Sequence, residues 1–152
     1  MQKSHFNRLI KEGFNHIPLS REIVVDTLTP LALYLKLANN PYSYFLESVQ
    51  GGEKWGRYSF IGLAAETVIK VNNYQVRVEK NGKLAEEISV EDPLAWIEEY
   101  QNQFKVPQLA SLPDFNGGLV GYFGYEIVRY IEPKLAHIDK TDELNVPDIL
   151  LM

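Results

Sequence analysis

Residues 67–88 read TVIKVNNYQVRVEKNGKLAEEI, and apolar side chains alternate with polar ones along most of this stretch. A period of two residues is typical of a β-strand with one buried face. Asn72-Asn73 and Asn81-Gly82 interrupt the alternation, and the second pair tolerates the positive φ angles of a two-residue hairpin turn. The stretch therefore predicts three antiparallel strands joined by short turns, over residues 67–71, 74–79 and 83–88.

Two further strands are predicted before this unit. Residues 42–49 and 57–63 show a similar alternation, and the glycine-containing segment 50–56 connects them. We expect these strands and those of residues 67–88 to form one antiparallel meander of four or five strands. Residues 17–26 include the β-branched run Ile23-Val24-Val25, which predicts another strand.

The 3.6-residue spacing of apolar side chains predicts three helices. The first covers residues 4–13, with Ser4 as its N-cap and Gly13 at its end. Thr29 followed by Pro30 begins the second, over residues 30–38, and Asp92-Pro93 begins the third, because proline is favoured at the first helical position. The inward-facing side chains would be Leu31, Leu35 and Ala38 in the second helix, and Leu94, Ile97, Tyr100 and Phe104 in the third.

The last third of the chain is rich in glycine. Residues 117–125 read GGLVGYFGY and predict a buried strand whose glycines allow close backbone packing, since the pattern lacks the spacing and the lysine of a phosphate-binding loop. We expect a helical turn over residues 126–130 and an exposed polar loop over residues 136–145. Glu126 and Glu132 flank Arg129, and we interpret the three as a surface ion-pair cluster.

Residues 147–152, PDILLM, predict an apolar strand that no polar residue or turn closes. Such an ending is unusual for a complete domain, so we expect the chain to be part of a longer protein. We also expect residues 119–120 and 149–151 to expose apolar surface that the rest of that protein would cover.

Composition and charge exclude several classes of protein. The 152 residues suit one domain, and 15 basic against 20 acidic side chains give a net charge of −5, which disfavours nucleic acid as a partner. The sequence has no cysteine, which excludes disulfides and thiolate sites. No apolar run approaches the ~20 residues of a membrane span, and no signal core follows the N-terminus. We therefore expect a cytoplasmic protein that binds neither nucleic acid nor membranes.

Polar side chains gather where the strands of residues 42–49 and 57–63 would pair. Glu47 and Ser48 end the first strand, and Arg57, Tyr58 and Ser59 open the second. A carboxylate, hydroxyls and a guanidinium at the mouth of one loop can bind both ends of a zwitterion such as an amino acid. The alternative is an ion pair between Glu47 and Arg57 with serines capping the loop. Spacing alone favours the ion pair over the ligand site.

Several stretches resemble a known family. They are residues 33–37 (LYLKL), 45–48 (FLES), 55–62 (WGRYSFIG), 116–126 (NGGLVGYFGYE) and 128–132 (VRYIE). All are similar to the N-terminal region of anthranilate synthase component I, one of the chorismate-utilising enzymes, and the similarity runs from about Phe14 to Met152. The combination of FLES, WGRYS and VRYIE favours this branch over aminodeoxychorismate and isochorismate synthases.

The resemblance implies an α+β fold in which antiparallel β-sheets pack face to face with peripheral helices. Residues 1–152 would be the N-terminal domain, an incomplete part of a larger two-subdomain sandwich. The whole enzyme would be a lyase that converts chorismate to anthranilate and pyruvate, using Mg²⁺ and ammonia from a glutamine amidotransferase subunit (component II). Its chorismate and Mg²⁺ residues would lie in the C-terminal portion, so these 152 residues alone would be inactive.

The resemblance also implies a feedback site for L-tryptophan on these residues. The family's LLES element corresponds to residues 45–48, so Glu47 and Ser48 are expected to contact the inhibitor, with Arg57, Tyr58 and Ser59 beside them. Two alternatives remain: the N-terminal part of an aminodeoxychorismate synthase of the folate pathway, or a stand-alone amino-acid-binding module without catalysis.

Overall fold

The structure is a computed structural model that describes residues 2–47, 58–113, 115–135 and 145–152. Its helices are α1 (Lys3–Lys11), α2 (Pro30–Leu37), α4 (Pro93–Asn102) and α5 (Val128–Ile131), with the 3₁₀ turns η1 (Tyr125–Ile127) and η2 (Pro133–Leu135). Its strands are β1 (Tyr44–Glu47), β2 (Ser59–Gly62), β3 (Thr67–Asn72), β4 (Gln75–Lys80), β5 (Lys83–Ser89), β6 (Gly121–Phe123) and β7 (Ile149–Leu151).

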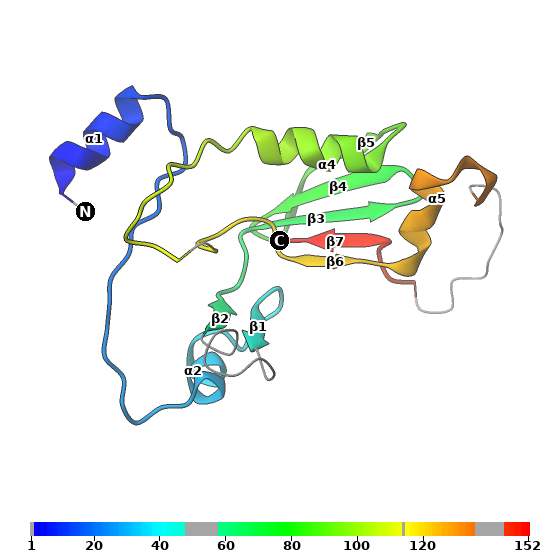
Figure 1. The fold of residues 1–152 in the computed structure, drawn as a ribbon. Coiled ribbons are helices and arrows are strands. Elements are labelled where there is room, and N and C mark those ends of the chain that lie inside the picture. The colour runs from blue at the N-terminus through cyan, green and yellow to red at the C-terminus, as the bar shows by residue number, and fades with distance from the viewer. Residues whose placement is uncertain (1, 48–57, 114, 136–144) are drawn as a thin grey trace.

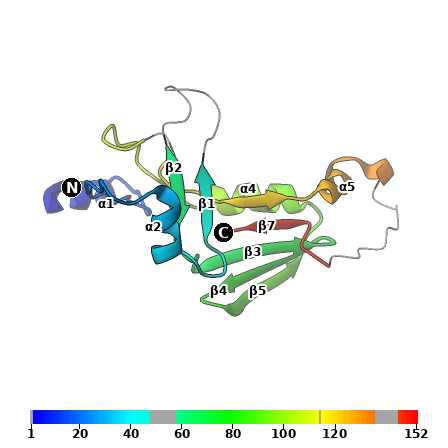
Figure 2. The ribbon, with the colours of Figure 1, turned by 90° about the horizontal axis from the view of Figure 1, so that it is seen from below.

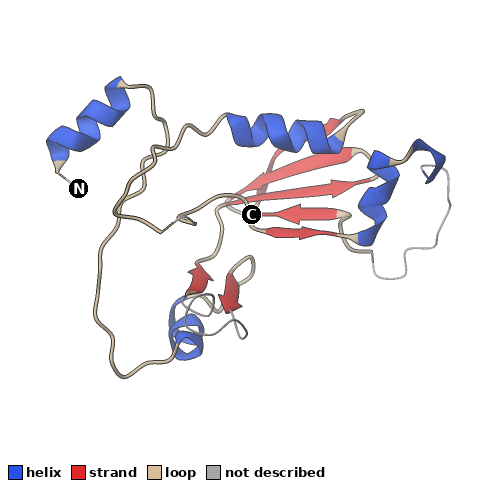
Figure 3. Ribbon diagram, in the orientation of Figure 1, coloured by secondary structure: helices blue, strands red, loops and turns tan. Residues whose placement is uncertain are grey.

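The strands form two antiparallel sheets, one of β1 and β2 and one of five strands in the order β5-β4-β3-β7-β6 (Figures 1 and 3). Antiparallel sheets with peripheral helices confirm the predicted α+β class. We call α2, β1 and β2 the small lobe, and the five-stranded sheet with α4 and α5 the sheet lobe. Within the described residues, no helix combines the length and the apolar character needed to cross a membrane.

The unit β3-β4-β5 confirms the three predicted strands and the turn at Asn81-Gly82. Asn81 and Gly82 have φ angles of 52° and 71°, as a two-residue hairpin turn with positive φ requires. The other turn lies one residue later than predicted. Its positive φ angles fall on Asn73 and Tyr74, at 46° and 65°, and β4 therefore begins at Gln75.

The order of strands corrects the predicted meander. β3 pairs with β7 from the far end of the sequence, whereas β2 pairs only with β1 among the described strands. β7 thus lies inside the sheet, and Ile149 and Leu151 are 0% and 3% exposed. The strand over residues 147–152 is confirmed, but the expected exposure is wrong at Ile149 and Leu151, because β3 and β6 flank the strand and its core-facing side chains are covered.

One face of the five-stranded sheet carries the core. Seven buried side chains form a single cluster there: Ile69, Val71, Val76, Val78, Ile97, Ile149 and Leu151. Ile97 belongs to α4, which begins as predicted, since the Asp92 carboxylate accepts hydrogen bonds from the backbone N–H groups of Leu94 and Ala95 at 2.9 and 3.0 Å. α4 lies along the sheet (Figure 1). The side chains of Trp96 and Tyr100 on this helix pack against the core.

The small lobe lies against the opposite face of the sheet. Lys70 points away from the core because it alternates with Ile69 and Val71, and its Nζ atom lies 5.2 Å from the ring centre of Tyr42, which precedes β1. The predicted helix start is confirmed, since Thr29 Oγ1 accepts a hydrogen bond from the Ala32 backbone N–H at 3.2 Å. Figure 2 shows β1, β2 and α2 grouped together at one end of the sheet.

Two predictions in this part of the chain are wrong. Residues 17–26 form no strand, and Ile23 and Val24 are 70% and 80% exposed, because a β-branched run needs a neighbouring strand before it can form a ladder. The predicted inward stripe of the second helix is buried only at Ala38, whereas Leu31 and Leu35 are exposed. Within the described residues, little of the chain lies over that side of α2.

The glycine-rich strand is also corrected. β6 covers only Gly121–Phe123 and is exposed, since it forms an edge of the sheet. The predicted close packing is confirmed at Gly121, because a Cβ atom there would collide with the carbonyl oxygen of Leu150. The helical turn after it is confirmed by η1 and α5, and most of the predicted loop over residues 136–145 lies outside the described residues.

The N-terminal helix is confirmed with a different start. α1 begins at Lys3, Gln2 is its N-cap position without a side-chain hydrogen bond, and Ser4 lies inside the helix. Gly13 follows the helix with a φ of +91°, which favours glycine there.

Candidate functional site

The predicted site lies at the end of the β1-β2 ribbon where residues 48–57 connect the two strands. Glu47, the last residue of β1, is opposite Ser59, the first residue of β2. Ser59 Oγ donates a hydrogen bond to Glu47 Oε1 at 3.4 Å, so the structure brings these two predicted residues together. Ser48 and Arg57 lie outside the described residues, and neither the ion pair nor the ligand-binding interpretation is tested at these positions.

Aromatic rings lie on both faces of this ribbon. On the face that carries Glu47, the ring of Phe45 stacks on Tyr34 of α2, with 5.6 Å between ring centres. On the other face, Phe60 meets Phe115 edge-on at 5.0 Å. A hollow of about 320 Å³ lies beside Tyr58 and Phe60, lined also by Pro113 and Phe115. Tyr58 therefore belongs to this aromatic hollow, and strand alternation places it on the opposite face from Glu47 and Ser59.

The described residues leave this end of the ribbon partly uncovered. Glu47 is exposed and Ser59 is half-buried. A site for a small molecule covers 70–90% of its ligand, and the described residues of this corner offer one wall only. The arrangement can supply a carboxylate that accepts hydrogen bonds from an ammonium group, and a hydroxyl beside it. A closed site would need a second wall.

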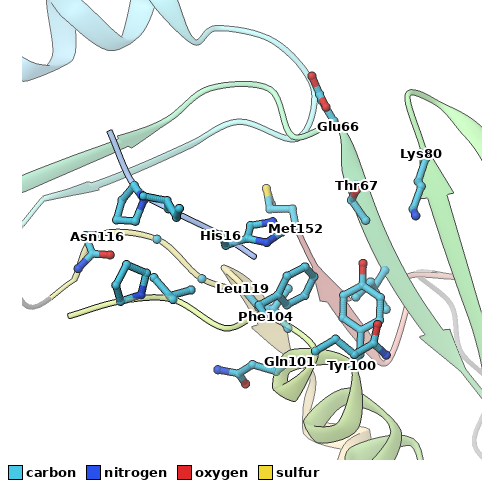
Figure 4. Close-up of a pocket in the computed structure, with 18 of the residues that line it drawn as sticks. His16, Glu66, Thr67, Lys80, Tyr100, Gln101, Phe104, Asn116, Leu119 and Met152 are labelled. Atoms are coloured by element: carbon cyan, nitrogen blue, oxygen red, sulfur yellow. The ribbon is translucent and has the colours of Figure 1, made fainter. Parts of the chain in front are cut away.

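A larger cavity of about 900 Å³ lies on the core side of the sheet, where α4 ends (Figure 4). Phe104 and His16 form part of its wall, with their rings edge-on at 4.7 Å, and Met152 and Leu119 line it as well. Tyr100 also lines it, and burial, with the charge of Glu86 as a smaller cause, raises the pKa of its hydroxyl. The cavity has mainly apolar walls and the size of a small-molecule site, but no predicted site residue lines it.

Asp148, directly before β7, is a polar centre that the sequence analysis missed. Its carboxylate accepts hydrogen bonds from Arg129 Nη2 at 2.9 Å, from the Tyr130 hydroxyl at 2.5 Å and from the Asn73 backbone N–H at 3.0 Å. Its own N–H donates to the Asn72 side chain at 3.1 Å. The carboxylate thus fastens α5 and the β3-β4 turn to the start of β7.

The surroundings of Asp148 correct the interpretation of Arg129. The expected ion pair with Glu126 exists at 3.7 Å, but the shorter one, at 2.9 Å, joins Arg129 to Asp148. Burial, followed by the hydrogen bond to Asp148, raises the pKa of Tyr130. Each of these polar groups has a hydrogen-bond or ion-pair partner within the cluster, as is typical of a structural polar network. No local pattern could have indicated it, because its members come from three distant parts of the sequence.

No protein-family model matches the chain, but individual proteins do. Anthranilate synthase component 1 of Pseudomonas aeruginosa is 54% identical over all 152 residues, which are 31% of that protein. Anthranilate synthase component 1 of Neisseria meningitidis serogroup B is 48% identical over 100% of this chain and 31% of its own length. That of Aquifex aeolicus is 38% identical over 95% of this chain and 29% of its own length.

Along its whole length the chain is related to anthranilate synthase component 1. The resemblance found in the sequence is therefore confirmed. The chain spans a little less than a third of the length of these component 1 proteins. The similarity identifies the family of the whole region, whereas the roles of Glu47, Ser59 and their neighbours stay predictions.

Proposed function

We propose that these 152 residues are the N-terminal, tryptophan-sensing part of an anthranilate synthase large subunit. The observation that carries the proposal is the similarity to component 1 proteins over the whole chain, at 38–54% identity. In the complete enzyme, chorismate and ammonia would be converted to anthranilate and pyruvate. A glutamine amidotransferase, component II, would supply the ammonia, as the name component 1 suggests.

The catalytic centre is proposed to lie in the remaining part of the enzyme. Within the described ranges, no three His, Asp or Glu side chains lie close enough together to hold a metal ion, so these residues offer no fit for Mg²⁺. We propose that Mg²⁺ and chorismate bind outside these ranges. The chain alone should then form no anthranilate, and its own residues serve regulation.

The β1-β2 corner is the proposed tryptophan-binding element. The Glu47 carboxylate would accept a charge-assisted hydrogen bond from the ammonium group of the inhibitor, and Ser48 and Ser59 would offer hydroxyls to its polar end. Arg57 would contribute its guanidinium beside the hydroxyls, whereas Tyr58 would face the aromatic hollow on the other side of the ribbon. Because the described residues of this corner form one wall only, we propose that the rest of the enzyme supplies the second wall of the pocket.

Inhibition of the full-length enzyme by tryptophan tests this proposal. We expect Ser48→Ala to raise the inhibition constant by roughly 10- to 100-fold, because a hydrogen bond to a charged ligand group contributes about 1.5–3 kcal/mol. Turnover of chorismate without tryptophan should hardly change. Ser89→Ala, on the edge strand β5 of the sheet lobe, is the matched control and should leave the inhibition curve unchanged. Superimposable curves for Ser48→Ala and wild type would refute a role for Ser48 in tryptophan binding.

Two other functions remain as alternatives. An aminodeoxychorismate synthase would use the same substrate, but the component 1 proteins that match the chain carry the anthranilate name. Analysis of the product formed from chorismate and ammonium by the full-length protein separates the two. A stand-alone amino-acid-binding module would bind tryptophan in the same corner without any associated turnover.

A further inference from the structure

The protein has more surface than a folded chain of its mass should expose. Its accessible surface is 12051 Å², and its mass is 17.4 kDa. A compact monomer of this mass exposes roughly 7,900 Å². The excess of about 4,000 Å² is several times the ~800 Å² that one partner contributes to a standard interface. Some of this surface is therefore suited to be covered by other polypeptide.

The segment with the most exposed apolar side chains is residues 19–28, which we call the arm. It runs between α1 and α2 as a long irregular connection (Figure 1). Leu19 is 71% exposed, and Ile23 and Val24 are more exposed than any core residue. No hydrogen bond or ion pair joins the arm to the other described residues. Among the described residues, the backbone N–H and C=O groups of the arm thus have no hydrogen-bond partner, which such groups need when they are buried.

The side chains of the arm suit a particular kind of partner. In a strand, Ile23 and Val25 would lie on one face and Val24 on the other, so both faces would be apolar. Strands with two apolar faces are found inside layered structures and not at solvent-exposed edges. Leu31 and Leu35 on α2, just beyond the arm, continue the exposed apolar surface.

A second copy of this chain is a poor partner for the arm. The symmetric antiparallel pairing that matches the apolar run with itself is centred on Val24. This pairing places Glu22 of each copy directly opposite Asp26 of the other copy. The pair of strands would therefore contain two such contacts, and like charges directly opposite each other destabilise a ladder. Shifting the centre to Ile23 or Val25 sets a charged side chain opposite an apolar one.

We propose that residues 22–26 form a β-strand in the full-length protein, paired with a strand from the two-thirds of that protein outside residues 1–152. The partner strand would have an apolar centre, and would place neutral or basic side chains opposite Glu22 and Asp26. This inference rests on the proposed function only in taking the chain as part of a longer polypeptide. Backbone pairing would satisfy the free groups of the arm, and the layers around it would cover Ile23, Val24 and Val25.

Amide hydrogen exchange of the full-length protein tests the inference directly. We expect the amides of residues 23–25 to exchange at least 100-fold more slowly than in an unstructured peptide of the same sequence. The slowing should be unchanged over a hundredfold dilution of the protein. Exchange within tenfold of the unstructured rate would overturn the proposal. Slow exchange that is lost on dilution would also overturn it, since the partner would then be a second copy.

Two variants sharpen the measurement. Val24→Pro removes a backbone N–H in the middle of the proposed strand, whereas Ser20→Pro does so outside it. We expect Val24→Pro alone to restore fast exchange at Ile23 and Val25; if it does not fold, the wild-type measurement still decides. Tryptophan inhibition of the same preparations keeps the two proposals apart. A tryptophan-inhibited enzyme with fast exchange in the arm would refute only the strand, and a protected arm without inhibition would refute only the tryptophan site.

Discussion

The sheet lobe and the small lobe are both built from short antiparallel strands and helices capped in the same way, yet they differ in how much they bury. In the sheet lobe, the facing side chains of β3, β4 and β7 are fully enclosed beneath α4. In the small lobe, no described residue of α2, β1 or β2 is buried, and only Ala38, directly after α2, is enclosed. The sheet lobe therefore has a hydrophobic core that stabilises it on its own. The small lobe has no such core in its described residues, and its apolar surfaces are suited to be covered by other polypeptide.

The largest expected effect comes from truncating one apolar side chain in each lobe. Ile149→Ala in β7 should lower the free energy of unfolding by about 2–5 kcal/mol, because it leaves a cavity among fully buried neighbours. Leu46→Ala in β1 should cost less than about 1 kcal/mol, because Leu46 is half exposed. Urea unfolding of the 152-residue chain measures both. Equal losses would show that the small lobe has a core of its own.

Replacing a carboxylate by an amide in each lobe should give the next largest difference. Asp148→Asn removes the charge that holds Arg129, and we expect a loss of about 1.5–3 kcal/mol because the carboxylate is nearly buried and accepts several hydrogen bonds. Glu47→Gln should cost less than about 0.5 kcal/mol, since Glu47 is exposed and has one long hydrogen bond in the described residues. Urea unfolding without tryptophan measures the loss of stability in both variants. A loss for Glu47→Gln as large as that for Asp148→Asn would contradict the difference between the lobes.

The smallest effect should be visible at alkaline pH. The pKa of Tyr130 is raised above the ordinary value for tyrosine of about 10, so its neutral form stabilises the folded state. That contribution is complete below pH 10 and is lost as the pH rises further, because the unfolded chain releases the proton first. Tyr130→Phe should therefore cost about 1 kcal/mol at pH 7 and progressively less above pH 10.

Denaturant titrations from pH 7 to pH 11 provide the comparison for Tyr130. Tyr34→Phe, whose hydroxyl lies 3.3 Å from Ser43 Oγ in the small lobe, is the matched variant at pH 7 and should cost less than about 0.5 kcal/mol. A constant difference between wild type and Tyr130→Phe across this pH range would mean that the hydroxyl of Tyr130 titrates normally.

Much of the sheet lobe could be predicted because its signals are local. The turn at Asn81-Gly82 and the cap at Asp92 act within a few residues, so the sequence pattern alone locates β4, β5 and α4. The position of β7 between β3 and β6 could not be predicted in the same way. Ile149 pairs with Val71 although about half of the chain separates them, and an apolar strand does not specify which neighbour it will have.

In the candidate site, too, local contacts could be predicted from the sequence and long-range contacts could not. The register that sets Glu47 opposite Ser59 follows from two consecutive strands, and was within reach of the sequence. The Asp148 network was not, since Asn73, Arg129 and Asp148 become neighbours only when the sheet has formed. Residues 17–26 show the opposite error, since the β-branched run predicts a strand but no described strand pairs with it in these 152 residues.

The place of β7 also has a consequence for the order in which the protein forms during synthesis. Residues 67–89 can close their hairpins as soon as they leave the ribosome, because each strand is joined to the next by a short turn. One edge of β3 then stays unpaired until residues 149–151 have been translated. Until then the nascent chain presents the edge of β3 and the apolar side chains of Ile69 and Val71 to its surroundings. Chaperones that bind emerging apolar segments should therefore engage this protein at chain lengths between the completion of β5 and the arrival of β7.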